Sequence, residues 1–60
     1  MSTYYQYRVR LLRYPVMLYN GHSFERASAY MDEYESHDRT LERRTNDGWR
    51  TAVRVELGNG

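Results

Sequence analysis

The residues of this chain that could support catalysis are few, and they lie near its middle. Ser36, His37 and Asp38 follow one another, and these are the residue types of a hydrolase triad. Three adjacent residues cannot fold back into a relay that passes a proton from serine through histidine to a carboxylate, because that geometry needs separate elements. We therefore interpret the run as polar residues at the end of a helix.

A metal site is the second chemistry to consider. Glu33 and His37 lie four residues apart, a spacing that places two ligands on one face of a helix. A zinc site needs three or four ligands, and the third would have to be Asp38 or the distant His22. A contact between the acid and the histidine near the helix C-terminus, where a cation is favoured, explains the spacing better. We predict no metal.

Two residue types that often carry enzyme chemistry are missing. The chain has no cysteine, and all nine of its basic residues are arginine. The lack of cysteine excludes thiolate nucleophiles, disulfides and cysteine-bound zinc, and the lack of lysine excludes Schiff bases and the lysine of a phosphate-binding loop. We predict a protein without enzymatic activity and without a cofactor.

The length of the chain, 60 residues, predicts a single small domain over 1–60. A domain of this size buries only about 60% of the surface of its unfolded chain, so it depends on good packing or self-association when it has no disulfide. No apolar run approaches the roughly 18 residues of a membrane span, and the N-terminus lacks a secretory signal pattern. We expect a cytoplasmic protein that makes no contact with membranes.

Alternating side chains predict a first strand over about 4–13. The residues on its apolar face are Tyr5, Tyr7, Val9 and Leu11. Pro15 disfavours a central strand beyond that point. We therefore expect the apolar segment 14–21 to form either an edge extension of the first strand or a packed loop.

An amphipathic helix is predicted over about 24–37. Ser23 suits the N-cap position after the turn residues Asn20 and Gly21, and Glu25 lies in the first turn, where a negative charge is favourable. One arc of this helix is apolar or aromatic and consists of Phe24, Ala27, Tyr30, Met31 and Tyr34. The opposite side is mainly acidic, so we expect one side packed on a sheet and the other in solvent.

A β-hairpin is predicted over about 39–57 by the turn residues NDG. A two-residue loop would pair Asn46 with Trp49, whereas a three-residue loop pairs Thr45 with Trp49 and gives Gly48 a left-handed conformation. We prefer the three-residue loop, because it places most apolar residues on one face. That face would carry Leu41, Trp49, Thr51, Val53, Val55 and Leu57.

Together these elements predict an α+β domain of two layers in the order β-α-β-β. The sheet would have three antiparallel strands in the spatial order 1-3-2, with the helix on one face. A parallel pairing of the first strand with the second is the alternative.

The outer face of this sheet is the predicted partner surface. Its candidate contacts are Tyr4, Arg8, Arg10, Arg44, Arg50 and Arg54, with Trp49 as an anchor or as a residue of the hairpin core. Arginine and tyrosine are typical of protein interfaces. Arginine between aromatic residues can also hold single-stranded nucleic acid, and an uncovered sheet face must be polar in any case. We favour protein binding over nucleic-acid binding, since the net charge is only +1.

A set of apolar residues is hard to place in so small a core. It comprises Leu12, Val16, Met17 and Leu18. These residues either complete the monomer or form the surface of a homodimer next to an edge strand.

The helix SFERASAYMDEYES and the hairpin RRTNDGWRTAVRV together cover under half of the chain. Following a first strand, they resemble the small single-domain proteins of phages and other mobile elements, among them anti-CRISPR inhibitors. The resemblance implies a non-enzymatic protein of the host cytoplasm that binds a host protein or ribonucleoprotein complex and blocks or redirects it. The net charge of +1 argues against an inhibitor that mimics DNA.

Overall fold

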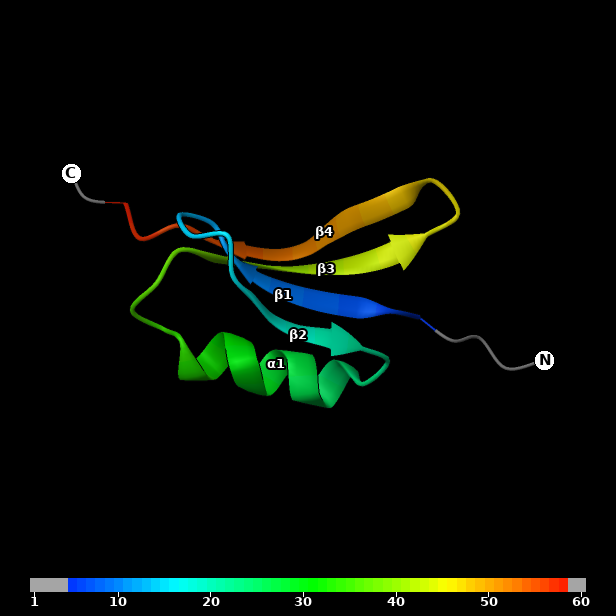
Figure 1. Cartoon of the computed structure of the whole chain (residues 1–60), viewed down its shortest axis with the longest axis horizontal. Coiled ribbons are helices and arrows are strands. Elements are labelled where there is room, and N and C mark those ends of the chain that lie inside the picture. The colour runs from blue at the N-terminus through cyan, green and yellow to red at the C-terminus, as the bar shows by residue number, and fades with distance from the viewer. Residues whose placement is uncertain (1–4, 59–60) are drawn as a thin grey trace.

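The chain combines one helix with one antiparallel sheet. The computed structural model describes residues 5–58. Its elements are β1 (Tyr7–Leu11), β2 (Met17–Gly21), α1 (Phe24–Glu33), β3 (Arg39–Thr45) and β4 (Gly48–Val55) (Figure 1). The predicted α+β class is confirmed. The predicted three-stranded sheet is wrong, because the sheet has four strands in the order β2-β1-β3-β4.

The additional strand is β2. Its segment was expected to extend the first strand or to form a packed loop, but Met17–Gly21 folds back and pairs antiparallel with β1 at the sheet edge. The amide of Val16 donates to the carbonyl of Tyr14, and the amide of Leu11 donates to the carbonyl of Val16, over 2.7 and 3.1 Å. Pro15 lies inside this reversal, where no ladder hydrogen bond needs its missing N–H.

The neighbour of the first strand also differs from the prediction. β1 pairs antiparallel with β3, with Val9 opposite Leu41, and not with β4. A central strand is buried on both faces, and β3 meets that requirement because Thr40 and Glu42 are buried on the side opposite Leu41. A glutamate at a central position is not expected from apolar patterning, which explains the error in strand order.

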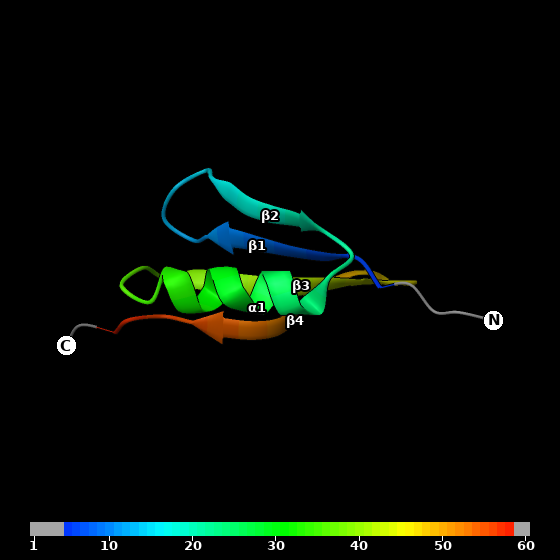
Figure 2. The same ribbon diagram turned by 90° about the horizontal axis from the view of Figure 1, so that it is seen from below.

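The helix lies across one face of the sheet (Figure 2). It contacts β1, β2 and β3, and Val55 at the end of β4 packs against the same core. The buried core between the two layers consists of Val9, Ala27, Met31 and Leu41. The N-cap prediction is confirmed, since the hydroxyl of Ser23 accepts a hydrogen bond of 3.1 Å from the amide of Arg26.

The helix is shorter than the predicted 24–37. It ends at Glu33, and its last turn holds no basic residue. Acidic side chains oppose the helix dipole at this end, which disfavours continuation through Glu35. Arg39 instead donates from Nη1 to the carbonyls of Glu35 and His37, over 3.2 and 3.0 Å. These contacts satisfy the backbone oxygens that follow the helix.

The hairpin loop has two residues and not the predicted three. Thr45 pairs with Gly48, so that only Asn46 and Asp47 lie in the loop. Gly48 has the expected positive φ, 105°. The register then slips between Leu41 and Glu42.

This slip is a β-bulge in β4, and it decides which residues share a face. Leu41 pairs with Val53 as predicted, whereas Glu42 pairs with Thr51, which leaves Ala52 as the extra residue. The extra residue that the prediction placed in the loop therefore lies within β4. As a consequence, Trp49 and Thr51 lie on the face away from the helix, and Arg50 lies on the helix side.

Candidate binding surface of the sheet

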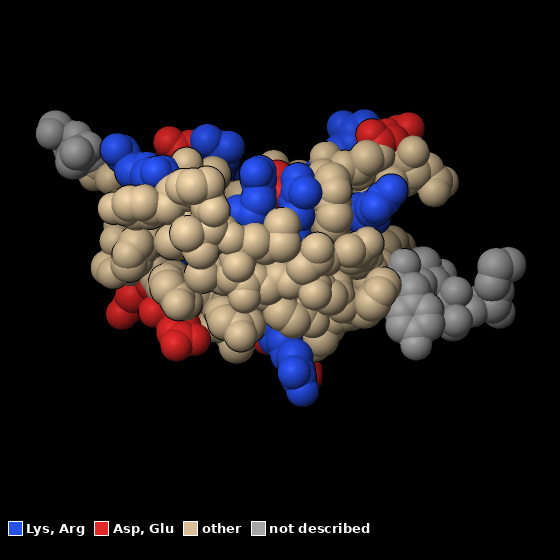
Figure 3. Space-filling view, in the orientation of Figure 1, with Lys and Arg blue, Asp and Glu red and all other residues tan. Residues whose placement is uncertain are grey.

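The open face is the side of the sheet that α1 does not cover. The residues whose register places them on it are Arg8, Arg10, Met17, Asn20, Thr40, Glu42, Arg44, Trp49, Thr51 and Arg54. Most of the basic side chains line the upper side of the molecule in Figure 3, and a group of acidic side chains lies below, on the helix side. Positive charge therefore predominates on the open face, and the helix, with three acidic residues and one arginine, carries a net negative charge.

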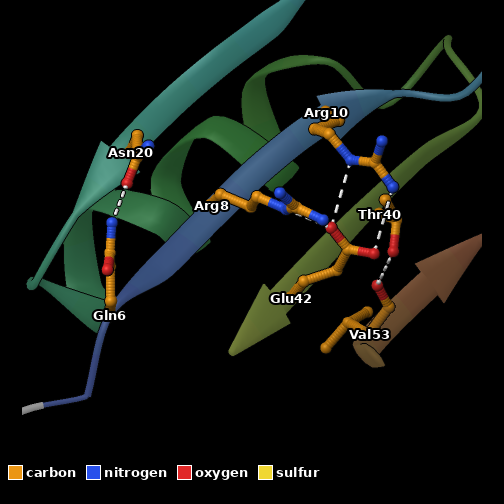
Figure 4. A network of polar contacts seen from close by, with 7 residues as sticks. All are labelled: Gln6, Arg8, Arg10, Asn20, Thr40, Glu42 and Val53. Atoms are coloured by element: carbon orange, nitrogen blue, oxygen red, sulfur yellow. Dashed lines mark hydrogen bonds and ion pairs between the residues drawn. The ribbon is translucent and has the colours of Figure 1, made fainter. Parts of the chain in front are cut away.

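Glu42 is the centre of the open face (Figure 4). Its Oε1 accepts from Nε of Arg8 at 2.6 Å and from Nε of Arg10 at 3.1 Å, and its Oε2 accepts from Nη2 of Arg10 at 3.1 Å. Burial alone would raise the pKa of Glu42, but the hydrogen bonds and charges of both arginines outweigh burial and hold the pKa below its usual value. Two arginines thus share one ionised carboxylate.

Arg8 connects this carboxylate to the only tryptophan. Its guanidinium carbon lies 4.1 Å from the centroid of the Trp49 ring, within the range of a cation–π contact. Because Glu42 holds Arg8 in place, the ring is supported from beneath. Arg44 is exposed opposite Trp49 on the neighbouring strand, and within residues 5–58 it forms no ion pair. The result is a positioned aromatic ring with an unpaired cation beside it.

Several other polar side chains on or beside the open face are also paired. Thr40 donates from its hydroxyl to the carbonyl of Val53 at 3.3 Å, and Gln6 donates from its amide to the Asn20 side chain at 2.7 Å. Arg54 donates to Glu56 at 2.6 Å. The ion pair of Arg54 with Glu56 is exposed and contributes little to stability, because solvent screens it.

The structure brings most of the predicted contacts together. Arg8, Arg10, Arg44, Trp49 and Arg54 share the open face. Arg50 was expected there but lies on the helix side because of the bulge, 3.4 Å from Asp47. Tyr4 lies outside the described residues.

Sequence reasoning missed the role of Glu42. The carboxylate of this residue organises two of the arginines. The signal was available: Arg8 and Arg10 are two residues apart, so they point to the same face of one strand. A neighbouring strand then needs one acid to pair with both.

The predicted dimer surface is only partly assembled. Val16 and Met17 are exposed and line a hollow of about 190 Å³. Leu18 instead packs against the core, and Leu12 is half-buried, with its amide donating to the carbonyl of Asp38 at 3.0 Å. The exposed part therefore reduces to the β1–β2 turn and the start of β2.

The triad residue types do not form a relay. Ser36 Oγ lies 3.3 Å from Nδ1 of His37, but the carboxylate of Asp38 is engaged elsewhere. It accepts from Nε of Arg13 at 2.6 Å and from the amide of Leu57 at 2.7 Å. These two hydrogen bonds lower the pKa of Asp38, so this acid joins the C-terminal segment to the β1–β2 turn.

Within residues 5–58 there is no group of three or more side chains that could hold a metal ion. In the same part of the chain, none of the helices is long and apolar enough to cross a membrane. Comparison of the chain with protein-family models, with curated proteins and with solved structures finds no match. The function therefore has to be argued from the geometry of the surface itself.

Proposed function

We propose that the chain is a small binding module without enzymatic activity, which docks on a larger protein or ribonucleoprotein complex through the open face. The observation that supports this proposal is the support of Trp49 by Arg8, which Glu42 holds in turn. Tryptophan and arginine are the residues that most often contribute large binding energies at protein interfaces. A ring that is already positioned loses little conformational entropy on binding.

The charge of the open face favours a protein over a nucleic acid. Arg8, Arg10 and Arg54 are each paired with a carboxylate, and Arg44 is the remaining unpaired arginine on this face among the described residues. A polyanion gains most of its affinity from cations that are free to displace its counterions. Four arginines and the two carboxylates that pair with them leave a local charge of only about +2.

The module would act by covering a surface of its partner. This mode of action agrees with the resemblance of its helix and hairpin to phage inhibitors. More specifically, we propose that the protein inhibits or modulates a host complex. This mode of action requires binding alone, and no residue has to make or break a covalent bond.

The test is capture of a partner followed by direct binding. Tagged protein is compared with Trp49→Ala and Arg44→Glu variants, and with Glu33→Arg as a matched surface change on the helix. Once a captured partner is purified, Trp49→Ala should weaken binding by at least about thirtyfold, the effect of losing a central aromatic contact. Binding that is unchanged in both open-face variants, with folding intact, would move the site elsewhere.

A second measurement distinguishes protein binding from nucleic-acid binding. Fluorescence polarisation with random single-stranded oligonucleotides at low salt should show no specific binding. If binding appears, and its logarithm falls with the logarithm of salt at a slope of about −0.7 per phosphate, the nucleic-acid alternative replaces the proposal.

A further inference from the structure

A hollow of about 690 Å³ lies at the end of the sheet where β1 begins. Its walls come from the residues just before β1 (Tyr5 and Gln6), the β2–α1 turn (His22) and the end of β3 (Arg43 and Arg44). We call this hollow the cationic notch, because none of its lining residues among the described part of the chain is acidic.

The ends of the strands explain how neighbouring arginines reach one hollow. Arg43 lies opposite Tyr7 on the helix side of the sheet, so Arg44 points to the open face, since successive side chains alternate. The amide of Arg44 donates to the carbonyl of Gln6 at 2.8 Å, and the β3–β4 hairpin projects beyond this point (Figure 1). Where the sheet narrows to the hairpin, both residues line the same hollow although they lie on opposite faces of β3.

The positive charge at this end of the sheet is poorly compensated. Arg43 lies directly opposite Arg50 on β4, and like charges in that relation destabilise a sheet. Asp47 contacts Arg50 at 3.4 Å, but both side chains are mostly exposed, so the pair contributes little. Within residues 5–58, Arg43 and Arg44 have no carboxylate partner. Three arginines and one aspartate leave about +2 near the notch.

One of these cations is also held in place. The guanidinium carbon of Arg43 lies 4.4 Å from the centroid of the Tyr5 ring, and the carbonyl of Tyr5 is 3.1 Å from Nδ1 of His22. A stacked guanidinium keeps its N–H donors at the edge of its plane, where they match the oxygens of a phosphate. Asn46 also borders the notch, and its side-chain amide can donate further hydrogen bonds.

We propose that the cationic notch binds the dianionic phosphate of a phosphate monoester between Arg43 and Arg44. A dianion offsets the local excess of positive charge, and two planar forks can share its oxygens. A nucleic-acid chain fits less well, because it needs further free cations along its path. The neighbouring arginines Arg8 and Arg10 are already bound to Glu42.

The test uses phenyl phosphate as the probe. The Nε–Hε signals of isotope-labelled protein are followed by NMR during the titration, and the signals of Arg43 and Arg44 are expected to shift and saturate. Arg43→Gln should weaken binding about tenfold, the loss of one charge-assisted contact. Arg26→Gln removes the same charge from an exposed helix position and should leave the affinity unchanged.

Arg43→Lys keeps the charge and removes the planar fork, so it provides a second variant if Arg43→Gln unfolds. It too should bind phenyl phosphate more weakly than the wild type. The proposal is overturned by the absence of saturable shifts, by affinity in Arg43→Lys equal to wild type, or by an equal loss in Arg26→Gln. Tighter binding of a short oligonucleotide than of phenyl phosphate would overturn it as well.

The proposal for the cationic notch and the proposal for the open face can be refuted independently of each other. Trp49→Ala should abolish partner capture and leave phenyl phosphate binding unchanged, because Trp49 does not line the notch. Arg43→Gln should weaken phenyl phosphate binding and leave partner capture unchanged, because Arg43 lies on the helix side of the sheet.

Discussion

Replacing Glu42 by glutamine should loosen the open face while preserving its shape. The carboxylate accepts three hydrogen bonds, one from Arg8 and two from Arg10. Glutamine keeps one oxygen for Arg8, but its NH₂ group would face the Nη2 donor of Arg10. The variant also leaves two arginines on this face without their shared counter-charge.

The cost can be derived from these contacts. Hydrogen bonds to a charged group contribute about 1.5–3 kcal/mol and neutral ones about 0.5–1.5 kcal/mol. The side chains of Arg8 and Arg10 are 21% and 42% exposed, against 12% for Glu42, so solvent screening places the effect at the lower end. We expect Glu42→Gln to cost about 1–2 kcal/mol, which lowers the melting temperature of a domain of this size by roughly 4–16 °C.

Thermal unfolding followed by circular dichroism measures this change. The protein contains one tryptophan, so fluorescence of Trp49 reports separately on its contact with Arg8 and should change in the folded variant. Glu33→Gln is the matched control, because it removes one negative charge from an exposed position on the helix.

The dependence on pH provides the decisive comparison. Because Arg8 and Arg10 lower the folded-state pKa of Glu42, its contribution is present above the unfolded-state pKa and is lost as the pH falls through the folded-state value. The difference between wild type and Glu42→Gln should therefore narrow in acid. A melting temperature that is equal to or higher than that of Glu33→Gln at neutral pH would refute the reasoning.

Three further changes test the fold. Leu41→Ala empties a core position that is 1% exposed and should cost about 2–5 kcal/mol, which urea unfolding can measure against the exposed Leu57→Ala. Gly48→Ala should cost about 1–2 kcal/mol through backbone strain alone, since φ is 105° and no atom lies within 4 Å of the added Cβ; an equal effect of Gly58→Ala would contradict this. Asp38→Asn should destabilise the protein at neutral pH, because Arg13 and the amide of Leu57 lower the carboxyl pKa. That difference should disappear as the pH falls through the folded-state pKa, when urea midpoints of both proteins converge.

Local patterns in the sequence were sufficient for part of the fold. Alternation in the first strand placed Val9 on the core face, helical periodicity placed Ala27 and Met31 there, and the capping preference of serine located the start of α1 at Ser23. Each of these inferences depends only on residues that are close in the chain. None of them needed knowledge of which strand pairs with which.

The register of the hairpin shows where local patterns stop. A three-residue loop and a two-residue loop followed by a bulge both set Leu41 opposite Val53, so the apolar pattern cannot distinguish them. They differ only between the turn and the bulge, where they exchange the faces of Trp49 and Arg50. The contact of Arg8 with Trp49 agrees with the bulged register, and it joins residues that are far apart in the chain.

The arginines of this chain therefore differ in role according to their neighbours in space. Arg8 and Arg10 are committed to Glu42, and Arg39 is committed to the carbonyls that follow the helix. Arg39 is buried, and burying its charge requires the carbonyl acceptors of Glu35 and His37. Arg43 and Arg44 have no such acceptor among residues 5–58, so a ligand or partner can gain their full charge without first breaking an ion pair. Sequence composition shows nine equivalent arginines, whereas the structure separates those that hold the sheet together from those left to bind.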